Sequence, residues 1–349
     1  MKKLILILFL SGLILLFFAI YLQPIALVVP HHNIVADIRL KMLKLIKNKR
    51  LVTKTVIILS PDHFSSDQKS IYFSDRTWDF PSGKQYFDKK VGSMITKKLK
   101  SDNNLVANDH GIFNVASDVN VVWPNAKIVP ILIGQEMSFD QISDLIFNID
   151  KSCKFDCLLI ASVDFSHYLP FRLANIHDEN SIRTLTNMEL ANPRQIEVDS
   201  PQSINTLIRF AGNNNARYFN LYNHTNSAEL VGSEDAESTS HVFGWYQRKL
   251  FANPKKYDVK TFTFAKNIDQ KLSLKPLGER FFYGTDIVSL NLGEGYKLPD
   301  GTLLMDNVVV AGVETPTEIK MEFLPLKCTF KICEFERGVK KWEVVIAKP

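Results

Sequence analysis

Two histidines in the first part of the chain each follow a short apolar run that is typical of a β-strand. His31 comes directly after Val28-Val29-Pro30, and His63 follows Ile57-Ile58-Leu59-Ser60-Pro61 by one intervening residue. In an open α/β sheet, ligands collect just beyond the carboxyl ends of the parallel strands. Imidazole binds iron, zinc and copper through one neutral ring nitrogen. The two histidines are therefore expected to supply part of a metal site at one edge of a sheet.

Such a metal site also needs a carboxylate. Two histidines and one carboxylate leave coordination positions open for water, substrate or oxygen, as in non-haem Fe(II) oxygenases and several hydrolytic zinc sites. Spacing alone does not choose the carboxylate, because four aspartates lie beside turns or predicted strand ends: Asp62, Asp109, Asp164 and Asp199. Asp199 also has an alternative role, since it precedes a predicted helix, where a carboxylate complements the helix dipole.

Asp164 and His167 form a further motif directly after the apolar run 157–163. A carboxylate near an imidazole can set its tautomer, and His167 would then be suited to general acid or base catalysis. The alternative is a histidine that is simply hydrogen-bonded at a strand end. His110 lies in an expected loop, shortly before another apolar run. The sequence has no Gly-x-Ser-x-Gly turn and no glycine-rich phosphate loop, which argues against serine hydrolases and nucleotide-binding proteins of the standard types.

The elements that must position these residues alternate between strand and helix. The almost wholly apolar run 157–163 is typical of a central parallel strand, and Ser200-Pro201 is a typical helix start. Strands are expected at 25–29, 55–59, 127–133, 157–163, 216–222 and 241–247, helices at 34–47, 87–99, 139–149, 172–190 and 201–210, and loops at 62–86 and from 101 onward. This alternation predicts a layered α/β sheet.

The composition changes after Asn253-Pro254-Lys255-Lys256, where short β-type runs separated by turns replace the alternation. Strands are expected at 259–264, 281–290, 308–313, 318–323, 328–333 and 342–346. We therefore predict an anchor at 1–24, an α/β domain at 25–252 and a small, mostly β domain at 253–349. No motif in the last domain indicates a particular chemistry.

The amino terminus is expected to form a single transmembrane anchor. Lys2 and Lys3 precede nineteen uncharged residues, 4–22, which is about the length that crosses a bilayer core. A cleaved signal peptide is the main alternative, but a small-residue cleavage site is missing. The two lysines favour a cytoplasmic amino terminus, which places most of the chain outside the cytoplasm. Six basic residues soon after the span argue the other way: Arg39, Lys41, Lys44, Lys47, Lys49 and Arg50.

The basic residues of helix 34–47 are expected to form a solvated face, with contact to an anionic bilayer as the alternative. The formal net charge of +5 is mild and the lysines are scattered, so a nucleic-acid partner is not expected. Four cysteines lie at positions 153, 157, 328 and 333. Their spacings are not those of zinc ribbons, and we expect partly buried thiols, although pairing outside the cytoplasm is the alternative.

Residues 25–250 resemble the Memo-like family, also called AmmeMemoRadiSam system protein B. Val29-Pro30-His31 is similar to the family's Pro-His-Ala-Gly segment, and Ser60-Pro61-Asp62-His63 to its Gly-Pro-Ser-His segment. Three further segments follow in the family's order: Asp109-His110-Gly111-Ile112, Lys127-Ile128-Val129-Pro130-Ile131-Leu132-Ile133-Gly134 and Ala161-Ser162-Val163-Asp164-Phe165-Ser166-His167. Single segments are weak signals, but five in order are specific.

This resemblance implies a layered α/β fold similar to that of the class III extradiol dioxygenases. It implies His31 and His63 as ligands of iron or copper, His167 as an acid or base beside Asp164, and His110 lining the cleft. Asp199-Ser200 stands where the family has Cys-Gly, so the resemblance implies Asp199 as the third ligand. Such a set of two histidines and a carboxylate is harder and suits Fe(II) best, with copper or zinc as alternatives.

Together, these observations predict a membrane-anchored metalloenzyme that oxidises a small molecule whose identity the sequence does not give. Two alternatives stay open. One is a zinc-dependent hydrolase that uses the same residues. The other is a binding or scaffolding module of Memo type, in which a metal only stabilises the fold. A weaker third interpretation is carbohydrate or lipid chemistry at the cell envelope, which only the anchor and the extra domain suggest.

Overall fold

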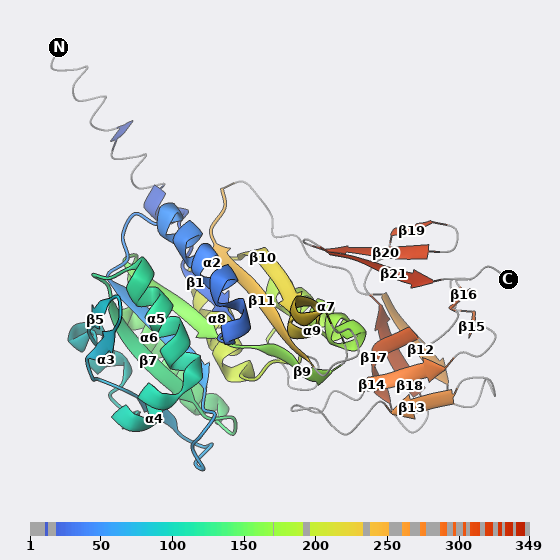
Figure 1. Cartoon of the computed structure of the whole chain (residues 1–349), viewed down its shortest axis with the longest axis horizontal. Helices are drawn as coiled ribbons and strands as arrows, with labels where there is room; N and C mark the ends of the chain where they lie inside the picture. Colours follow the sequence, from blue (N-terminus) through green and yellow to red (C-terminus); the bar gives the residue numbers. More distant parts are fainter. Residues whose placement is uncertain are drawn as a thin grey trace. The chain divides into compact units, whose positions relative to one another are not determined.

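The computed structural model describes residues 11–12, 19–169, 171–190, 196–232 and 238–250, together with the strands after residue 259 (Figure 1). The described chain is a mixed α/β fold with a central mixed sheet, as the alternation of strands and helices predicts. It divides into two compact units. The first contains Met1–Asp164, Ser200–Tyr222 and Phe243–Pro254, and the second contains Phe165–Asp199, Asn223–Val242 and Lys255–Pro349.

The main sheet has the strand order β10-β11-β1-β8-β2-β7-β3-β6. Its centre consists of four parallel strands that are buried along nearly their whole length: β1 (Ala26–Val29), β8 (Cys157–Ser162), β2 (Thr55–Pro61) and β7 (Lys127–Ile133). Burial on both faces explains why their sequences are continuously apolar. The flanking strands are β11 (Ser238–Gln247), antiparallel to β1, then β10 (Tyr218–Asn226), β3 (Ile71–Phe73) and β6 (Lys100–Ser101).

Helices cover the sheet on both sides. On one face, α2 (Ala36–Lys49) and α5 (His110–Val122) pack against each other and form one apolar core with Leu27, Val56 and Ile58 of the strands (Figure 1). The intervening strand residues, such as Val28 and Ile57, are also buried and point to the opposite face, since side chains alternate along a strand. There α8 (Pro201–Asn213) packs on β1, β8 and β2, and α6 (Phe139–Ser152) packs on α8.

The expectation of a loop from residue 101 onward is wrong, because that stretch contains α4 (Asn103–Asn108) and α5. Each helix begins after an aspartate whose side chain accepts hydrogen bonds from backbone N–H groups of the first turn, namely Asp102 and Asp109. The buried side chains of α5 have helical spacing: Ile112, Val115, Ala116, Val119 and Val122. His110 is therefore the first residue of a helix and not part of a loop.

The remaining elements of the described chain are short or lie in the second unit. They are η1 (Asn33–Val35), β4 (Trp78–Phe80), β5 (Gly83–Gln85), α3 (Lys89–Ile95), β9 (Phe165–Leu169), α7 (Phe171–Asn187), α9 (Ser227–Val231), β12 (Lys260–Ala265), β13 (Ser273–Pro276), β14 (Ile287–Asn291), β15 (Tyr296–Lys297), β16 (Leu303–Leu304), β17 (Val308–Glu314), β18 (Glu318–Phe323), β19 (Lys327–Thr329), β20 (Ile332–Arg337) and β21 (Lys340–Val345). The stretch 328–333, expected to be one strand, contains parts of two antiparallel strands, β19 and β20, in which Cys328 is the register partner of Cys333.

Cys153 and Cys157 form a disulfide, with their Cα atoms 5.3 Å apart. Cys153 lies at the end of α6 and Cys157 begins β8, so the bridge closes the short loop between these elements. The expectation of free thiols is therefore wrong for this pair. The two elements bring their ends together across only three intervening residues, which places the sulfur atoms within bonding distance.

The predicted membrane span, 4–22, lies largely outside the described residues, of which only 11–12 and 19–22 belong to it. Within the part of the chain that the structure describes, no helix combines enough length and apolar character to cross a bilayer. Membrane attachment therefore stays a prediction.

Candidate metal centre

Three of the predicted site residues occupy equivalent positions beyond neighbouring parallel strands. His31, Asp164 and His63 each lie two residues after the last residue of β1, β8 and β2, which are adjacent in that order. The register pairs Val29 with Ser162, so His31 and Asp164 leave the sheet at the same level. The Nε2 atom of His31 lies 3.2 Å from Oδ2 of Asp164. The ends of β1 and β8 therefore bring these two side chains to one edge of the sheet.

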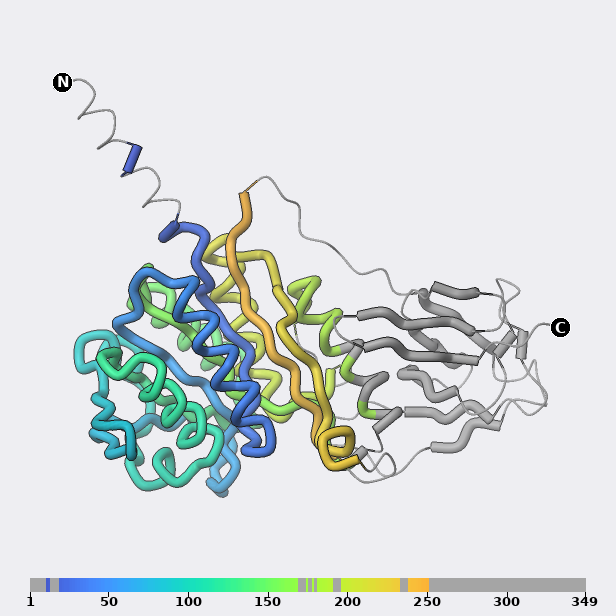
Figure 2. Tube along the Cα trace, turned by 45° about the horizontal axis from the view of Figure 1, so that its top comes forward, coloured from blue at the N-terminus to red at the C-terminus, as the bar shows by residue number. Residues whose placement is uncertain are grey.

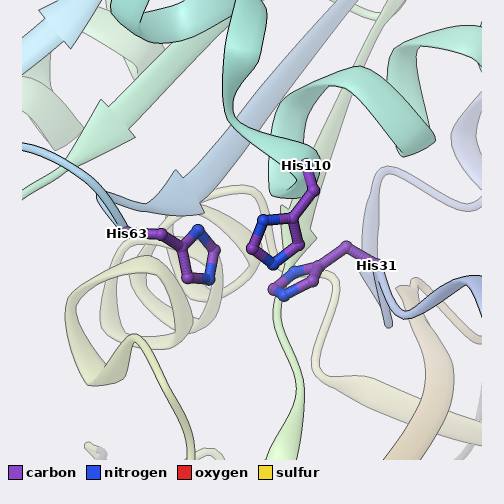
Figure 3. Close-up of side chains that lie close together, drawn as sticks. All are labelled: His31, His63 and His110. Carbon is purple, nitrogen blue, oxygen red and sulfur yellow. The ribbon is translucent and has the colours of Figure 1, made fainter.

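Three imidazoles converge at this edge (Figure 3). The ring centroids of His31 and His63 are 5.0 Å apart, those of His31 and His110 5.0 Å, and those of His63 and His110 4.1 Å. One nitrogen from each ring lies within 4.8 Å of the others. His31 and His63 come from strand ends and His110 from the first turn of α5, so three separate elements supply the cluster.

Asp109 holds the ring of His63. Its side chain is fully buried, and its Oδ1 atom lies 2.9 Å from Nδ1 of His63. The same carboxylate accepts hydrogen bonds from the backbone N–H groups of His63 and Gly111. Burial by itself would raise the pKa of Asp109, but the hydrogen bonds and the charge of His63 lower it overall. Asp109 is therefore an acceptor, which places a proton of His63 on Nδ1 and leaves Nε2 as the ring nitrogen that could bind a metal ion.

The sequence indicated Asp109 only as one of four candidate metal ligands, and its place behind His63 was missed. The available signal was the order aspartate, histidine, glycine before helically spaced apolar residues, which marks a helix start. Gly111 is needed at this start, since a Cβ atom there would lie 2.0 Å from the Oγ atom of Ser60 on β2. The glycine lets the first turn of α5 approach the sheet closely enough for Asp109 to meet His63.

The loop that carries His31 is fixed by a buried arginine. Arg39 donates hydrogen bonds from Nη1 to the carbonyl oxygens of Pro30 and His32, both at 3.1 Å, and pairs through Nε with Asp118 at 2.5 Å. Its side chain is only 2% exposed, so the expectation that the basic residues of this helix form a solvated face is wrong for Arg39. A lysine or arginine is rarely buried unless paired, and Asp118 supplies the pair.

Further contacts fix the ring of His31 in a dry environment. Asn114 donates a hydrogen bond to the carbonyl oxygen of His31 at 2.9 Å. Ser162 donates its hydroxyl proton to the carbonyl oxygen of Gly111 at 2.6 Å, and its Oγ atom lies 3.4 Å from Nδ1 of His31. Burial, helped by the nearby His63 and His110, lowers the pKa of His31 well below its usual value.

Burial and the neighbouring His63 also lower the pKa of His110, although its side chain reaches the surface. Neutral imidazoles are the form that binds metal ions, so the surroundings of His31 and His110 favour the form that can bind a metal. Ligand bonds of about 2.1 Å separate adjacent ligand atoms by roughly 3.0–3.4 Å. The distance of 3.2 Å between His31 and Asp164 has this size. The histidine group could therefore hold a metal ion.

The two other predicted site residues belong to the second unit. His167 lies in β9, where its register partner is Thr239 of β11. Asp199 directly precedes Ser200, and it is Ser200, not Asp199, whose side chain caps α8. Roles for His167 and Asp199 at the metal stay predictions. In the same unit, Nε2 of His224 lies 2.7 Å from Oδ2 of the buried Asp178.

Comparison with known proteins adds a family relationship to this geometry. The family described as Memo-like protein matches residues 14–241. A MEMO1 family protein from Caldivirga maquilingensis is 23% identical over 146 residues, which are 40% of this chain and 52% of that protein. A MEMO1 family protein from Thermoplasma volcanium is 22% identical over 225 residues, which are 61% of this chain and 82% of that protein.

The match thus spans about half the length of the Caldivirga protein. Among solved structures, the crystal structure of an uncharacterized protein from Escherichia coli K12 is similar with a TM-score of 0.41 and 13% identity, covering 62% of this chain and 99% of that one.

Proposed function

The chain belongs to the Memo-like family, and on this premise we propose that it is a metal-dependent oxidoreductase in which His31 and His63 bind one divalent ion, Fe(II). The observation that carries the proposal is the convergence of three imidazoles from separate elements, two of which have lowered pKa values. A group of three histidines, one of them buried, with an aspartate behind one ring is an arrangement that orients metal ligands.

Four further residues orient the ligands, contact the substrate or transfer a proton in this proposal. Asp109 keeps the proton of His63 on Nδ1, and Arg39 keeps the loop of His31 in place. His110, which is exposed, contacts the substrate at the open side of the cluster. His167 moves a proton, as the resemblance implies. Bound Fe(II) would supply redox chemistry with O2, while the protein supplies orientation and proton transfer.

Metal analysis of the full chain, purified in detergent and loaded with Fe(II) without oxygen, tests the ligands. We expect about one ion per chain, and His63→Ala is expected to lose most of it because a ligand is missing. His177→Ala is the matched control, since this histidine lies in α7 of the second unit. Equal metal content in His63→Ala and His177→Ala would contradict the ligand assignment.

The carboxylate ligand in this proposal is either Asp164 or Asp199, and the same metal analysis distinguishes the two. The structure places Asp164 beside His31, and the resemblance assigns Asp199. Replacing the true ligand with asparagine removes its charge and is expected to lower the metal content, while the other asparagine variant keeps it. His110→Ala is included because its ring nitrogen lies within 4.8 Å of the two others. Loss of metal in this variant would indicate a ligand set of three histidines.

The oxidoreductase part of the proposal is tested by the open coordination position. Nitric oxide is expected to bind the Fe(II) protein and give an electron paramagnetic resonance signal, because two histidines and a carboxylate leave positions free. A metal that accepts no added ligand would contradict catalysis and indicate a binding module of Memo type. Hydrolysis of an ester or amide by the zinc-loaded protein, without consumption of O2, would instead indicate a hydrolytic site.

We also propose that residues 4–22 anchor the protein in a membrane and that the remaining chain lies outside the cytoplasm. The uncharged stretch after Lys2 and Lys3 supports the anchor. The disulfide between Cys153 and Cys157 supports an oxidising compartment, since disulfides are rare in the cytosol. We expect the chain to resist extraction with alkaline carbonate and to be digested by protease added from outside. Release by carbonate would contradict the anchor.

A further inference from the structure

The sheet has a second edge, opposite the histidines, where the parallel strands begin. We call this edge the base; it comprises residues 21–25, 49–54, 125–127, 153–157 and 248–250. β1 starts at Ala26, so only residues 23–25 separate it from the end of the proposed membrane span at Leu22. β11 is antiparallel to β1 and ends here as well, with Ile25 donating a backbone hydrogen bond to Tyr246. The base is therefore the edge of the sheet nearest to the proposed span.

A rigid loop lies on the base beside the end of the span. The disulfide closes Cys153–Cys157, and the carbonyl oxygen of Phe155 accepts hydrogen bonds from Gln23 and from Arg50. Arg50, which is buried, also donates to the carbonyl oxygens of Pro24 and Cys157. These contacts fasten the backbone of the loop to the residues that follow the span.

This loop nevertheless presents its apolar side chain outward. The side chain of Phe155 is 56% exposed, and that of Leu51 in the neighbouring connection is 53% exposed. Leu250, just after the end of β11, is exposed as well. A fixed backbone that holds a phenylalanine and two leucines toward the outside favours an apolar or interfacial environment over water.

The charges around these side chains are almost all positive. Exposed lysines lie at the end of α2 and at the starts of β2, β7 and β8, and one follows β11: Lys49, Lys54, Lys127, Lys154 and Lys249. The starts of two of these strands are joined directly, because the backbone N–H of Lys127 donates to the carbonyl oxygen of Lys54 at 2.8 Å. Asp156 offsets one charge by pairing with Lys54 at 3.3 Å. A ring of lysines around apolar side chains matches the surface of an anionic bilayer.

We propose that the base docks on an anionic lipid bilayer, with Phe155 and Leu51 in the headgroup region and the surrounding lysines on lipid phosphates. This inference rests on the proposed membrane span. Docking would also determine that the metal centre faces away from the bilayer, because the histidines follow the opposite ends of the same strands. β2 has seven residues, which at about 3.3 Å each span roughly 23 Å. Docking therefore holds the histidine cluster away from the bilayer and open to the aqueous side.

Tryptophan quenching by lipids with brominated acyl chains tests the docking. The full chain is reconstituted into vesicles of phosphatidylcholine and phosphatidylglycerol. Because the wild-type protein has four tryptophans, its quenching is subtracted from that of each variant. The indole introduced by Phe155→Trp is expected to lose most of its emission. Phe113→Trp is the matched control, because Phe113 is also exposed but lies in the first turn of α5 at the histidine edge. Equal quenching of the two variants would overturn the proposal.

Charge reversal tests the lysines separately. Lys54→Glu combined with Lys154→Glu is expected to reduce the quenching of Phe155→Trp, whereas Lys69→Glu, an exposed lysine in the loop after β2, leaves it unchanged. Quenching that persists fully in phosphatidylcholine alone would overturn the role of anionic lipid. Flotation of the same vesicles distinguishes the two proposals. A chain that fails to float contradicts the span, while a chain that floats without quenching contradicts docking alone.

Discussion

Replacing Asp109 with asparagine tests whether this residue serves the metal centre through His63. Asparagine keeps one oxygen, which can still accept the hydrogen bond that Gly111 donates to Oδ1, and it caps helices about as well as aspartate. Its amide nitrogen takes the place of Oδ2, which accepts from the backbone N–H of His63. What asparagine loses is the charge that fixes the proton of His63 on Nδ1, across a contact of 2.9 Å. The amide can donate to Nδ1 instead, which would place the proton on the ligand atom Nε2.

The expected effect falls on metal affinity, beyond any loss of stability from the altered contact with the backbone of His63. Removing the hydrogen-bond partner of a metal-binding histidine weakens metal binding by about 10-fold to 100-fold. That range corresponds to about 1.4–2.8 kcal/mol of binding free energy, because tenfold in affinity is about 1.4 kcal/mol. Asp109 is completely buried, so water does not weaken its contact with His63. We therefore expect the loss of metal affinity to lie in the upper half of this range.

The assay is a competition titration of the full chain in detergent, with Fe(II) or Co(II) and a chelator of known affinity. Asp102→Asn is the matched control, because Asp102 caps α4 as Asp109 caps α5 but touches no histidine ring in the described contacts. Thermal unfolding of the metal-free proteins is measured in parallel. The reasoning would be refuted if Asp109→Asn bound metal as tightly as Asp102→Asn, or if it only lowered the unfolding temperature.

Three further predictions concern the stability of the metal-free chain. The pKa of His31 is lowered on folding, so the unfolded chain binds more protons than the folded chain below pH 6.5. The free energy of unfolding in urea should therefore fall as the pH drops from 7.5 to 5.5. The fall should be smaller in His31→Gln. Arg39→Met leaves Asp118 without its partner and should cost about 3–5 kcal/mol, whereas exposed Lys41→Met should be nearly neutral; equal midpoints would contradict this. Reduction of Cys153–Cys157 should cost about 2 kcal/mol for so short a loop; an unchanged midpoint in dithiothreitol would count against it.

The local pattern of the sequence predicted the four central parallel strands with little error, whereas β3, in the expected loop 62–86, was missed. β7 has the predicted bounds 127–133, and β2 and β8 begin at the predicted residues 55 and 157. Buried parallel strands are continuous apolar runs, so their sequences are easy to identify. The stretch 101–126 was harder, because α4 and α5 begin at aspartates and carry polar residues among their apolar ones. Its helical periodicity becomes plain only when α5 is seen to pack on the sheet.

For the metal centre as well, some features follow from the sequence and others only from the tertiary structure. The sequence by itself determined that His31, His63 and Asp164 follow apolar runs, because a residue and its distance from a strand end are local properties. Only the tertiary structure decided that these strands are adjacent and parallel, that α5 delivers His110 to the same edge, and that Asp109 and Arg39 stand behind the two histidine positions. Those facts depend on contacts between residues as far apart as Asp109 and His63 or Arg39 and Asp118. Such contacts are set by how whole elements pack, and no single stretch of sequence contains that information.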